Sequence, residues 1–505
     1  MKFRFAASCG INDDKTPRRK EVMKRLLALA VLASLLAGAA LAQAATEVKM
    51  EGDARIYGNF WSKENYTGWN FNGTQTQQSL TIWERFRLKT DFEAGEHLKF
   101  RFAIRVNDNA WGGSNFLIDN PAVAIQVYLA YLQFKWPDTK IKFTVGYQDV
   151  DLPISVDWLG SNPVMGGTQA AGAVVEIPVV DDNFEIVTGF TRLLDGHPGF
   201  EATTTTKADR LDGYMLALPI SLDTFKATPW GMVAVAGRDA PYGSIGVGDS
   251  TSQNQNLATN LLAPGTMAGL YGFSNAQNAY WWVGTTLSIT ALDPFKFYGD
   301  IIYGAGNGDD RKINKRQGLF FDLAAEYTGL DMVTPQLSFW YATGEDKSIS
   351  NGSERLPTVV NYWGPTNSFL FDTNQEFDFG FMGVNPVGSW GFVAGLDKVS
   401  FVTDLTHRLV FSYARGTNSP AGLRAANLLN GVGNYVEIGR DLTTQEQVYG
   451  VNFDTTYNIY ENLAAILETG WSHGDFQTSV WTHRFTNATR NGDAWKVAFG
   501  LKYKF

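Results

Sequence analysis

The sequence ends in the stretch AWKVAFGLKYKF, which runs from Ala494 to Phe505. Apolar side chains occupy every second position of this stretch: Trp495, Val497, Phe499, Leu501, Tyr503 and Phe505. The positions between them are small or cationic, and they include Lys496, Lys502 and Lys504. Side chains of a β-strand alternate between its two faces, so this stretch predicts a strand with one apolar and one polar face.

The same period of two appears at the other end of the chain, after residue 45. Segment 48–60 places Val48, Met50, Ala54, Ile56 and Phe60 on one face and Lys49, Glu51, Asp53, Arg55 and Asn59 on the other. Segments 80–92 and 98–106 repeat the pattern. Further strands are predicted near 122–136, 140–149, 171–180, 183–192, 210–220, 225–237, 278–291, 295–304, 317–328, 334–343, 388–400, 406–416, 445–458, 462–472 and 493–505. Eighteen strands result, or sixteen if the weakly alternating segments are discounted.

The connections between these strands alternate between short turns, such as Glu93–Glu96, and long loops, such as 238–277 and 344–387. Outer-membrane barrels have short periplasmic turns and long external loops, whereas a soluble sandwich has no reason to place every long loop at one end. A sheet crosses hydrocarbon only if it closes and leaves no edge unpaired. The sequence therefore predicts an all-β, transmembrane antiparallel β-barrel in which the terminal strand, ending at Phe505, closes onto the first.

The N-terminal 44 residues have a different composition. We interpret residues 1–44 as an N-terminal extension plus a signal peptide, with the signal proper at 23–44, because a basic start precedes the apolar run Leu26–Ala42 and an Ala-x-Ala cleavage site. A membrane anchor helix is the alternative. Residues 45–505 are predicted to form a single transmembrane barrel, located in the bacterial outer membrane and in contact with its lipids, with a loop at about 149–170 folded inward.

The composition and motifs of the chain argue against several kinds of bond, partner and activity. The single cysteine, Cys9, precedes the cleavage site, so we expect no disulfide. Removing residues 1–44 takes away eight Lys/Arg and three Asp/Glu, which leaves 34 against 48 and argues against nucleic acid as a partner. The five histidines accompany no nucleophile motif, and Asp309-Asp310 lacks the spacing of a calcium loop. We expect no enzyme activity, no catalytic residues, no metal and no cofactor.

Two stretches carry a resemblance. The terminal VAFGLKYKF (497–505) and the early EGDARIYGNFW (51–61), with the signal and the loop alternation, resemble trimeric outer-membrane porins of Gram-negative bacteria, in particular the homotrimeric porins of sulfate-reducing bacteria. The resemblance covers nearly all of residues 45–505. It implies passive diffusion of small hydrophilic solutes and ions, a homotrimer, and recognition of the C-terminal Phe505 by the barrel assembly machinery. Sixteen strands are usual in general porins and eighteen in sugar-specific ones.

If the apolar register faces lipid, the polar register faces a water-filled lumen. The predicted pore-lining or constriction bases are Arg55, Arg85, Arg87, Arg101 and Arg105. The alternative is that these charges are merely solvated or pair with Glu51, Asp53 and Asp91. The resemblance places the long connection after the fifth strand where general porins fold a loop into the pore, with Asp149, Asp151 and Asp157 as its acidic members. A loop that stays outside the barrel is the alternative for this segment.

Two other functions remain open from the sequence. A substrate-specific channel of the maltoporin type, for a sugar or an organic anion, would use aromatic residues as a track, and Trp61, Trp69, Trp83, Trp111 and Trp158 are the candidates. An adhesin or structural barrel would use the long loops. The net charge favours cations while the arginines favour anions, so the ion preference stays undetermined at this level.

Overall fold

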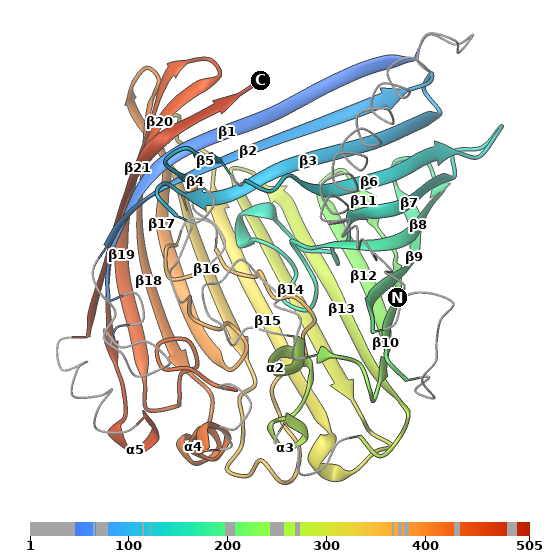
Figure 1. Cartoon of the computed structure of the whole chain (residues 1–505), viewed down its shortest axis with the longest axis vertical. Coiled ribbons are helices and arrows are strands. Elements are labelled where there is room, and N and C mark those ends of the chain that lie inside the picture. The colour runs from blue at the N-terminus through green and yellow to red at the C-terminus, as the bar shows by residue number, and fades with distance from the viewer. Residues whose placement is uncertain are drawn as a thin grey trace, which may run out of the picture.

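The computed structural model shows a closed barrel. It describes residues 46–63, 66, 79–113, 116–121, 123–196, 208–242, 257–267, 273–365, 368–371, 376–377, 383–428, 435–481 and 492–505. The predicted signal peptide at 23–44 lies outside the described residues. Figure 1 shows long strands surrounding an interior into which several connections fold.

Eighteen antiparallel strands form the wall in the described part of the chain. They are β1 (Glu47–Ser62), β2 (Ser79–Glu93), β3 (Leu98–Ala110), β6 (Gln126–Lys135), β7 (Lys142–Asp149), β8 (Gln169–Val180), β9 (Phe184–Asp195), β10 (Arg210–Ala217) with its continuation β11 (Ile220–Leu222), β12 (Phe225–Gly237), β13 (Gln277–Leu292), β14 (Phe295–Gly306), β15 (Arg316–Tyr327), β16 (Thr334–Ala342), β17 (Ser389–Val402), β18 (Leu405–Gly416), β19 (Gln447–Tyr460), β20 (Leu463–Asp475) and β21 (Asp493–Lys504). The predicted eighteen strands are confirmed, and the alternative of sixteen is not.

One strand is interrupted. Leu218 and Pro219 separate β10 from β11, and both pieces pair with β9 and β12. Proline has no N–H to donate to a neighbouring strand, so the ladder breaks at this point and resumes at Ile220. We therefore treat β10 and β11 as one wall strand.

The barrel closes through the two terminal strands. In the β1–β21 pair, Ile56 lies opposite Leu501 and Phe60 lies opposite Val497. Backbone hydrogen bonds between Gly52 and Phe505, in both directions, extend this pairing to the last residue. The prediction that the terminal strand closes the barrel is confirmed, because backbone pairing joins β1 to the last strand from Gly52 to Ser62.

Exposure shows which face of the wall is outside. Phe499 and Leu501 are 58% and 42% exposed, whereas Lys496 and Ala498 between them are 2% and 0% exposed. On β13, Trp281 and Val283 are exposed while Tyr280 and Trp282 are buried. The apolar register of these strands therefore faces outward, and the polar or small register faces the interior, as the alternation predicts.

The connections at the long-loop end carry the remaining elements. These elements are short helices and strands: η1 (Asp157–Leu159), α2 (Leu257–Leu261), α3 (Pro264–Met267), η3 (Lys312–Asn314), α4 (Pro420–Leu428), α5 (Thr478–Trp481) and the hairpin strands β4 (Phe116–Leu117) and β5 (Asn120–Pro121). Among the described residues, no helix has the length and apolar character needed to cross a membrane.

Candidate functional site: the lining of the barrel

A wall rich in arginine lines the interior at β1, β2 and β3. Arg55 on β1 lies directly opposite Arg85 on β2, and Arg87 lies directly opposite Arg105 on β3. Like charges at directly opposed positions repel each other, so the wall needs carboxylates to hold its shape. We call these strands with their inward charges the basic wall.

Two aspartates hold three of these arginines. Asp53 accepts hydrogen bonds from Arg85 Nη2 at 3.0 Å and from Arg87 Nε at 2.8 Å. Asp91 accepts from both Nε and Nη2 of Arg101, each at 2.6 Å, which is the parallel two-bond geometry that suits a guanidinium and a carboxylate. Arg85, Arg87 and Arg101 therefore pair with Asp53 and Asp91. The sequence analysis left this pairing open as an alternative.

Arg55 uses a carboxylate that sequence reasoning missed. Its Nε and Nη2 donate to Asp108 Oδ1 and Oδ2 at 3.1 and 2.6 Å, and both side chains are more than 90% buried. The alternation of β3 would turn Asp108 outward. A bulge in β3 sets two residues, Asn107 and Asp108, against the single residue Arg85 of β2, and this extra residue turns Asp108 inward. A period-two pattern alone carries no signal for such a bulge.

The basic wall keeps an excess of positive charge. Arg105 donates to Gln126 Oε1 at 3.2 Å and lies 5.5 Å from the ring centre of Tyr128, and the described residues give it no ion pair. The inward cations of the wall are Lys49, Arg55, Arg85, Arg87, Lys89, Lys99, Arg101 and Arg105, and the carboxylates that pair with them are Glu47, Glu51, Asp53, Asp91, Glu93 and Asp108. Eight cations meet six carboxylates, so the wall attracts anions locally.

The connection between β7 and β8 contacts the inner face of the opposite wall. Ser155 Oγ donates to Asp300 Oδ2 at 2.6 Å, and Asp300 lies on the inward register of β14. Gly160 forms a bridge with Trp363 and Met165 forms one with Val360, both in the connection between β16 and β17. Leu159, Val164 and Met165 are fully buried in these contacts. Segment 150–168 is thus held by the interior side of β14 and by another connection.

The three acidic residues predicted in this segment lie apart from those contacts. Asp149 and Asp151 are exposed; Asp149 Oδ1 accepts from Gln169 Nε2 at 2.8 Å, and Asp151 Oδ1 accepts from the Thr168 N–H at 3.4 Å. Asp157 is exposed at the start of η1. Within the described ranges, none of the three forms an ion pair with an arginine of the basic wall. Their role in a constriction stays a prediction.

Apolar packing fills the interior beside β13 to β18. Trp340 of β16 and Trp363 lie 5.5 Å apart between ring centres, and Phe371 packs against both rings. Trp363 Nε1 donates to Asp322 Oδ2 at 2.8 Å, which satisfies a buried polar group of β15. Because connections cover this part of the wall, the inside of the barrel is divided into a packed side and the charged side of β1 to β3.

Two residues, Glu376 and Phe377, link the packed side and the charged side of the barrel interior, and we call them the anchor. Glu376 and Phe377, from the connection between β16 and β17, donate their N–H groups to the carboxylate of Glu468 on β20, at 2.6 Å and 3.2 Å. Lys502 Nζ lies 2.6 Å from Glu376 Oε2, and Arg55 donates to the Glu376 carbonyl. Neither anchor residue was among the predicted site residues, because no local pattern in a long loop indicates a partner on a distant strand.

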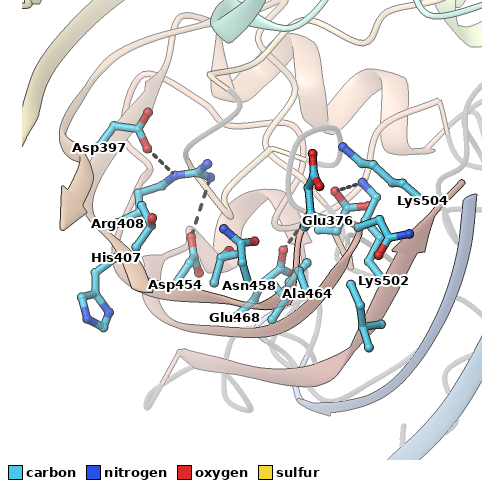
Figure 2. Close-up of a pocket in the computed structure, with 16 residues that line it drawn as sticks. Glu376, Asp397, His407, Arg408, Asp454, Asn458, Ala464, Glu468, Lys502 and Lys504 are labelled. Atoms are coloured by element: carbon cyan, nitrogen blue, oxygen red, sulfur yellow. Dashed lines mark hydrogen bonds and ion pairs between the residues drawn. The ribbon is translucent and has the colours of Figure 1, made fainter. Parts of the chain in front are cut away.

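A cavity of about 330 Å³ opens at the short-turn end, along the inner side of β17 to β21. Figure 2 shows Asp397, Arg408 and Asp454 at one end and Lys502 and Lys504 at the other. The turn between β19 and β20 supplies part of its lining.

At the long-loop end, a buried network joins the external connections. Arg355 Nη2 lies 2.6 Å from Asp441 Oδ1, and Arg440 lies 2.8 Å from the other oxygen. The two guanidinium groups lower the pKa of Asp441 to about 2, despite its burial. Glu345, nearby, accepts from Ser353 Oγ at 2.7 Å, and burial raises its pKa to about 7.

The four candidate tryptophans that the structure describes lie in separate environments. Trp61 lies against Lys496 at 5.3 Å, Trp83 packs near Tyr57, and Trp111 is exposed and donates to Glu84. Trp158 packs at the edge of the buried cluster around segment 150–168, and Trp69 lies outside the described residues.

Comparison with known proteins gives a likeness of fold. No protein-family model and no curated protein sequence matches the chain. Among solved structures, OccK8 (OprE) of Pseudomonas aeruginosa has 9% identity and a TM-score of 0.48, over 91% of this chain and 98% of that chain. OccAB3 of Acinetobacter baumannii has 10% identity and a TM-score of 0.48, over 91% of this chain and 99% of that chain. The outer membrane protein OprD of Pseudomonas aeruginosa has 10% identity and a TM-score of 0.47, over 90% of this chain and 94% of that chain. Likenesses this distant concern the fold alone, so the function has to be inferred from the residues of this chain.

Proposed function

We propose that the protein is an outer-membrane porin, a water-filled channel through which small hydrophilic solutes and ions diffuse passively. One observation carries the proposal: on the strand β21, Phe499 and Leu501 are exposed on the outside of a closed barrel, while Lys496 and Lys502 face its interior. Apolar side chains solvate acyl tails, and inward charges need water or partners. A closed wall with this polarity separates lipid from an aqueous space.

Export and assembly belong to the same proposal. The segment 23–44 would direct the chain across the inner membrane, and the terminal Phe505 would be read by the barrel assembly machinery. A homotrimer with three separate pores follows from the resemblance of 51–61 and 497–505 to trimeric porins. Migration of unheated protein on a gel, or native mass spectrometry, measures the number of chains directly.

We propose that segment 150–168 narrows the bore. The hydrogen bond from Ser155 to the inward Asp300 supports this, because it keeps the segment inside the wall. Asp149, Asp151 and Asp157 would then provide exposed carboxylates that share the aqueous space with the basic wall. A field between them would orient dipolar solutes as they pass.

A substrate-specific channel is the second candidate. The excess of cations over carboxylates in the basic wall favours an organic anion as its substrate. A sugar would need a run of aromatic surfaces, and the described tryptophans lie in separate environments.

The experiment that tests the channel is a planar-bilayer recording of the purified mature protein, followed by solute flux into liposomes with neutral solutes of graded size. We expect discrete conductance steps and a size limit. Absence of conductance from protein that is folded by circular dichroism would contradict the proposal and favour a structural barrel. Saturable block by a dicarboxylate such as succinate would favour the anion-specific channel over general diffusion.

A further inference from the structure

We propose that Arg87, Arg105 and Tyr128, on the inner face of the barrel, form a binding subsite for a tetrahedral oxyanion, either free phosphate or the phosphate group of an ester. The inference rests on the proposed channel function, because a solute reaches this part of the basic wall through the bore. It narrows the second candidate function from anions in general to one chemical class.

The two arginines lie close enough to hold one ion. Arg87 on β2 lies directly opposite Arg105 on β3. Directly opposed residues of antiparallel strands have Cβ atoms about 4.5–5.5 Å apart, which is less than the length of an arginine side chain. Both guanidinium groups can therefore contact the same small ion without any movement of the backbone.

Each of these guanidinium groups keeps unused donors. Arg87 donates through Nε to Asp53 at 2.8 Å, and Arg105 donates through Nε to Gln126 at 3.2 Å. Within the described residues, no hydrogen bond uses the Nη1 or Nη2 atom of either side chain. The Arg87 side chain is 34% exposed and Arg105 is partly exposed, so both can meet a solute in the bore.

A bulge in β6 brings Tyr128 to the same place. Ala103 of β3 pairs with Leu129, and Ile104 pairs with Val127, so Tyr128 is an extra residue between two paired ones. Tyr128 packs in one cluster with Ala103 and Leu129, which lie on the inward register. The bulge therefore turns the tyrosine toward the interior, where the alternation of β6 alone would turn it outward.

Tyr128 supplies a hydroxyl group without a partner. The guanidinium carbon of Arg105 lies 5.5 Å from the centre of the Tyr128 ring. Tyr128 is 7% exposed, and its hydroxyl is buried with no hydrogen-bond acceptor among the described residues. A buried hydroxyl that lacks a partner costs free energy, and an anion drawn to Arg87 and Arg105 would provide an acceptor.

The local charge matches a dianion. Asp53 pairs with both Arg85 and Arg87, and Arg105 has no ion pair in the part of the chain that the structure describes. Three guanidinium groups thus share one carboxylate, which leaves a net charge of +2, three minus one. Asp149 also lies within electrostatic range of Tyr128, but it is exposed to water and ions that screen its charge. A phosphate ester group carries about −1.5 to −2 at neutral pH.

The arrangement of the donors favours a tetrahedral ion over a planar one. One guanidinium group saturates a planar carboxylate, as Arg101 does with both oxygens of Asp91. Here two guanidinium groups and a hydroxyl come from three neighbouring strands, so their donors approach from separate directions. A phosphate can present one pair of oxygens to each guanidinium group and still accept a hydrogen bond from Tyr128. We therefore expect phosphate to bind more tightly than acetate or succinate.

The test measures block of the ion current through the mature protein in planar bilayers at about pH 8, where a phosphate group carries nearly two charges. Inorganic phosphate, glycerol phosphate, succinate and acetate are added at constant ionic strength. We expect saturating block by phosphate at lower concentration than by succinate, and least block by acetate. Block by glycerol phosphate as strong as that by phosphate identifies an ester group as an equally good ligand, whereas block by phosphate alone restricts the subsite to the free ion. Calorimetric titration of the protein in detergent with inorganic phosphate measures binding independently of current.

Two variants remove single contacts of the subsite. Arg105→Gln should raise the phosphate concentration for half-maximal block about tenfold, because it removes a charged donor group. Tyr128→Phe should raise it about threefold. The unfolding midpoint of Tyr128→Phe in urea should stay equal or rise, because the hydroxyl that is lost has no partner in the protein.

A third variant separates charge from geometry. Arg105→Lys keeps the positive charge but loses the planar pair of donors. The reversal potential in a KCl gradient should therefore stay unchanged, while the phosphate concentration for half-maximal block rises about threefold to fivefold.

Two matched controls complete the set. Tyr131→Phe removes a hydroxyl from the same strand, opposite Arg101, whose charge Asp91 already balances. Lys226→Gln removes an exposed lysine from the inward register of β12, on another part of the wall. Both should leave the block by phosphate intact.

The outcomes separate the subsite from the channel. A conducting protein that phosphate neither blocks nor binds overturns the subsite and leaves the channel standing. Equal block by phosphate, succinate and acetate, or equal weakening in Lys226→Gln and Arg105→Gln, would assign the effect to the total charge of the lumen and overturn the subsite. Folded protein without conductance overturns the channel, and the calorimetric titration still decides whether the subsite binds phosphate.

Discussion

Phe377 lies stacked on Tyr57, with ring centres 4.6 Å apart and ring planes 12° from parallel. Tyr57 belongs to the first strand and Phe377 to the connection between β16 and β17, and the two are 1% and 0% exposed. Together with the hydrogen bonds of Glu376 and Phe377 to Glu468, this contact fixes a long connection inside the barrel at the seam where the wall closes.

The first prediction follows from this anchor. Phe377→Ala removes the stack and should release the connection from the closing strands, raising single-channel conductance by about twofold because a wider aqueous path opens. Planar-bilayer recording measures it. Phe297→Ala, on the outward face of β14, is the control and should leave conductance unchanged. Equal conductance in Phe377→Ala and the unmodified protein would show that the anchor does not limit the path.

The second prediction concerns the basic wall. Arg85→Glu combined with Arg101→Glu reverses two charges that Asp53 and Asp91 hold. We expect the reversal potential in a KCl gradient to shift toward cation selectivity, since the wall then carries more negative than positive charge. Lys140→Glu, in a short turn, supplies a charge reversal outside the bore. Unchanged selectivity of the double variant would remove these arginines from the constriction.

The third prediction tests which side faces lipid. Phe499→Lys places a charge at the middle of β21 on its exposed face, and it should lower the free energy of unfolding in liposomes by about 2–4 kcal/mol. Tyr503→Lys places the same charge near the strand end and should cost about 1 kcal/mol or less. Urea titration of tryptophan fluorescence measures both. Equal costs at the two positions would argue against a membrane around this strand.

The fourth prediction is a pH dependence at the long-loop end. Glu345 is 2% exposed, its Oε1 is buried with no hydrogen-bond partner among the described residues, and its pKa is raised from 4.5 to about 7. The folded form therefore keeps a proton that the unfolded chain has already released. Stability should fall as pH rises from about 4.5 to about 7, by about 3 kcal/mol in total from this group.

Glu345→Gln isolates this effect. The amide cannot ionise, so the variant should lose the part of the pH dependence that lies between pH 4.5 and 7. Unfolding midpoints in urea at pH 5 and pH 8 provide the measurement. Glu354→Gln is the comparison, because Glu354 lies in the same connection and is less buried. An identical pH profile in the unmodified protein and in Glu345→Gln would exclude Glu345 as the titrating group.

The wall of the barrel follows from local sequence. Lipid on one side and water on the other impose a period of two on every strand, and this period is visible at Val48 and Phe60 as clearly as at Phe499 and Leu501. The closure of β21 onto β1 also follows, because an unpaired edge cannot exist in hydrocarbon. Strand order and the outward face needed no long-range information, whereas the structure decided between eighteen and sixteen strands.

The contacts between side chains inside the bore could not be predicted from local sequence in the same way. The inward residues Arg85 and Arg101 could be identified by register, but their partners depend on pairing between strands, and Asp108 reaches Arg55 only through a bulge that the alternation conceals. The anchor at Phe377 lies in a loop with no period, so nothing local relates it to Tyr57.

The sequence by itself determined the closed wall, because each strand must satisfy the same two solvents independently of its neighbours. The tertiary structure alone decided which charges meet inside. Asp454 and Glu468 come face to face, and Lys504 joins their cavity, because the shear of the whole barrel sets the height of each strand relative to the others.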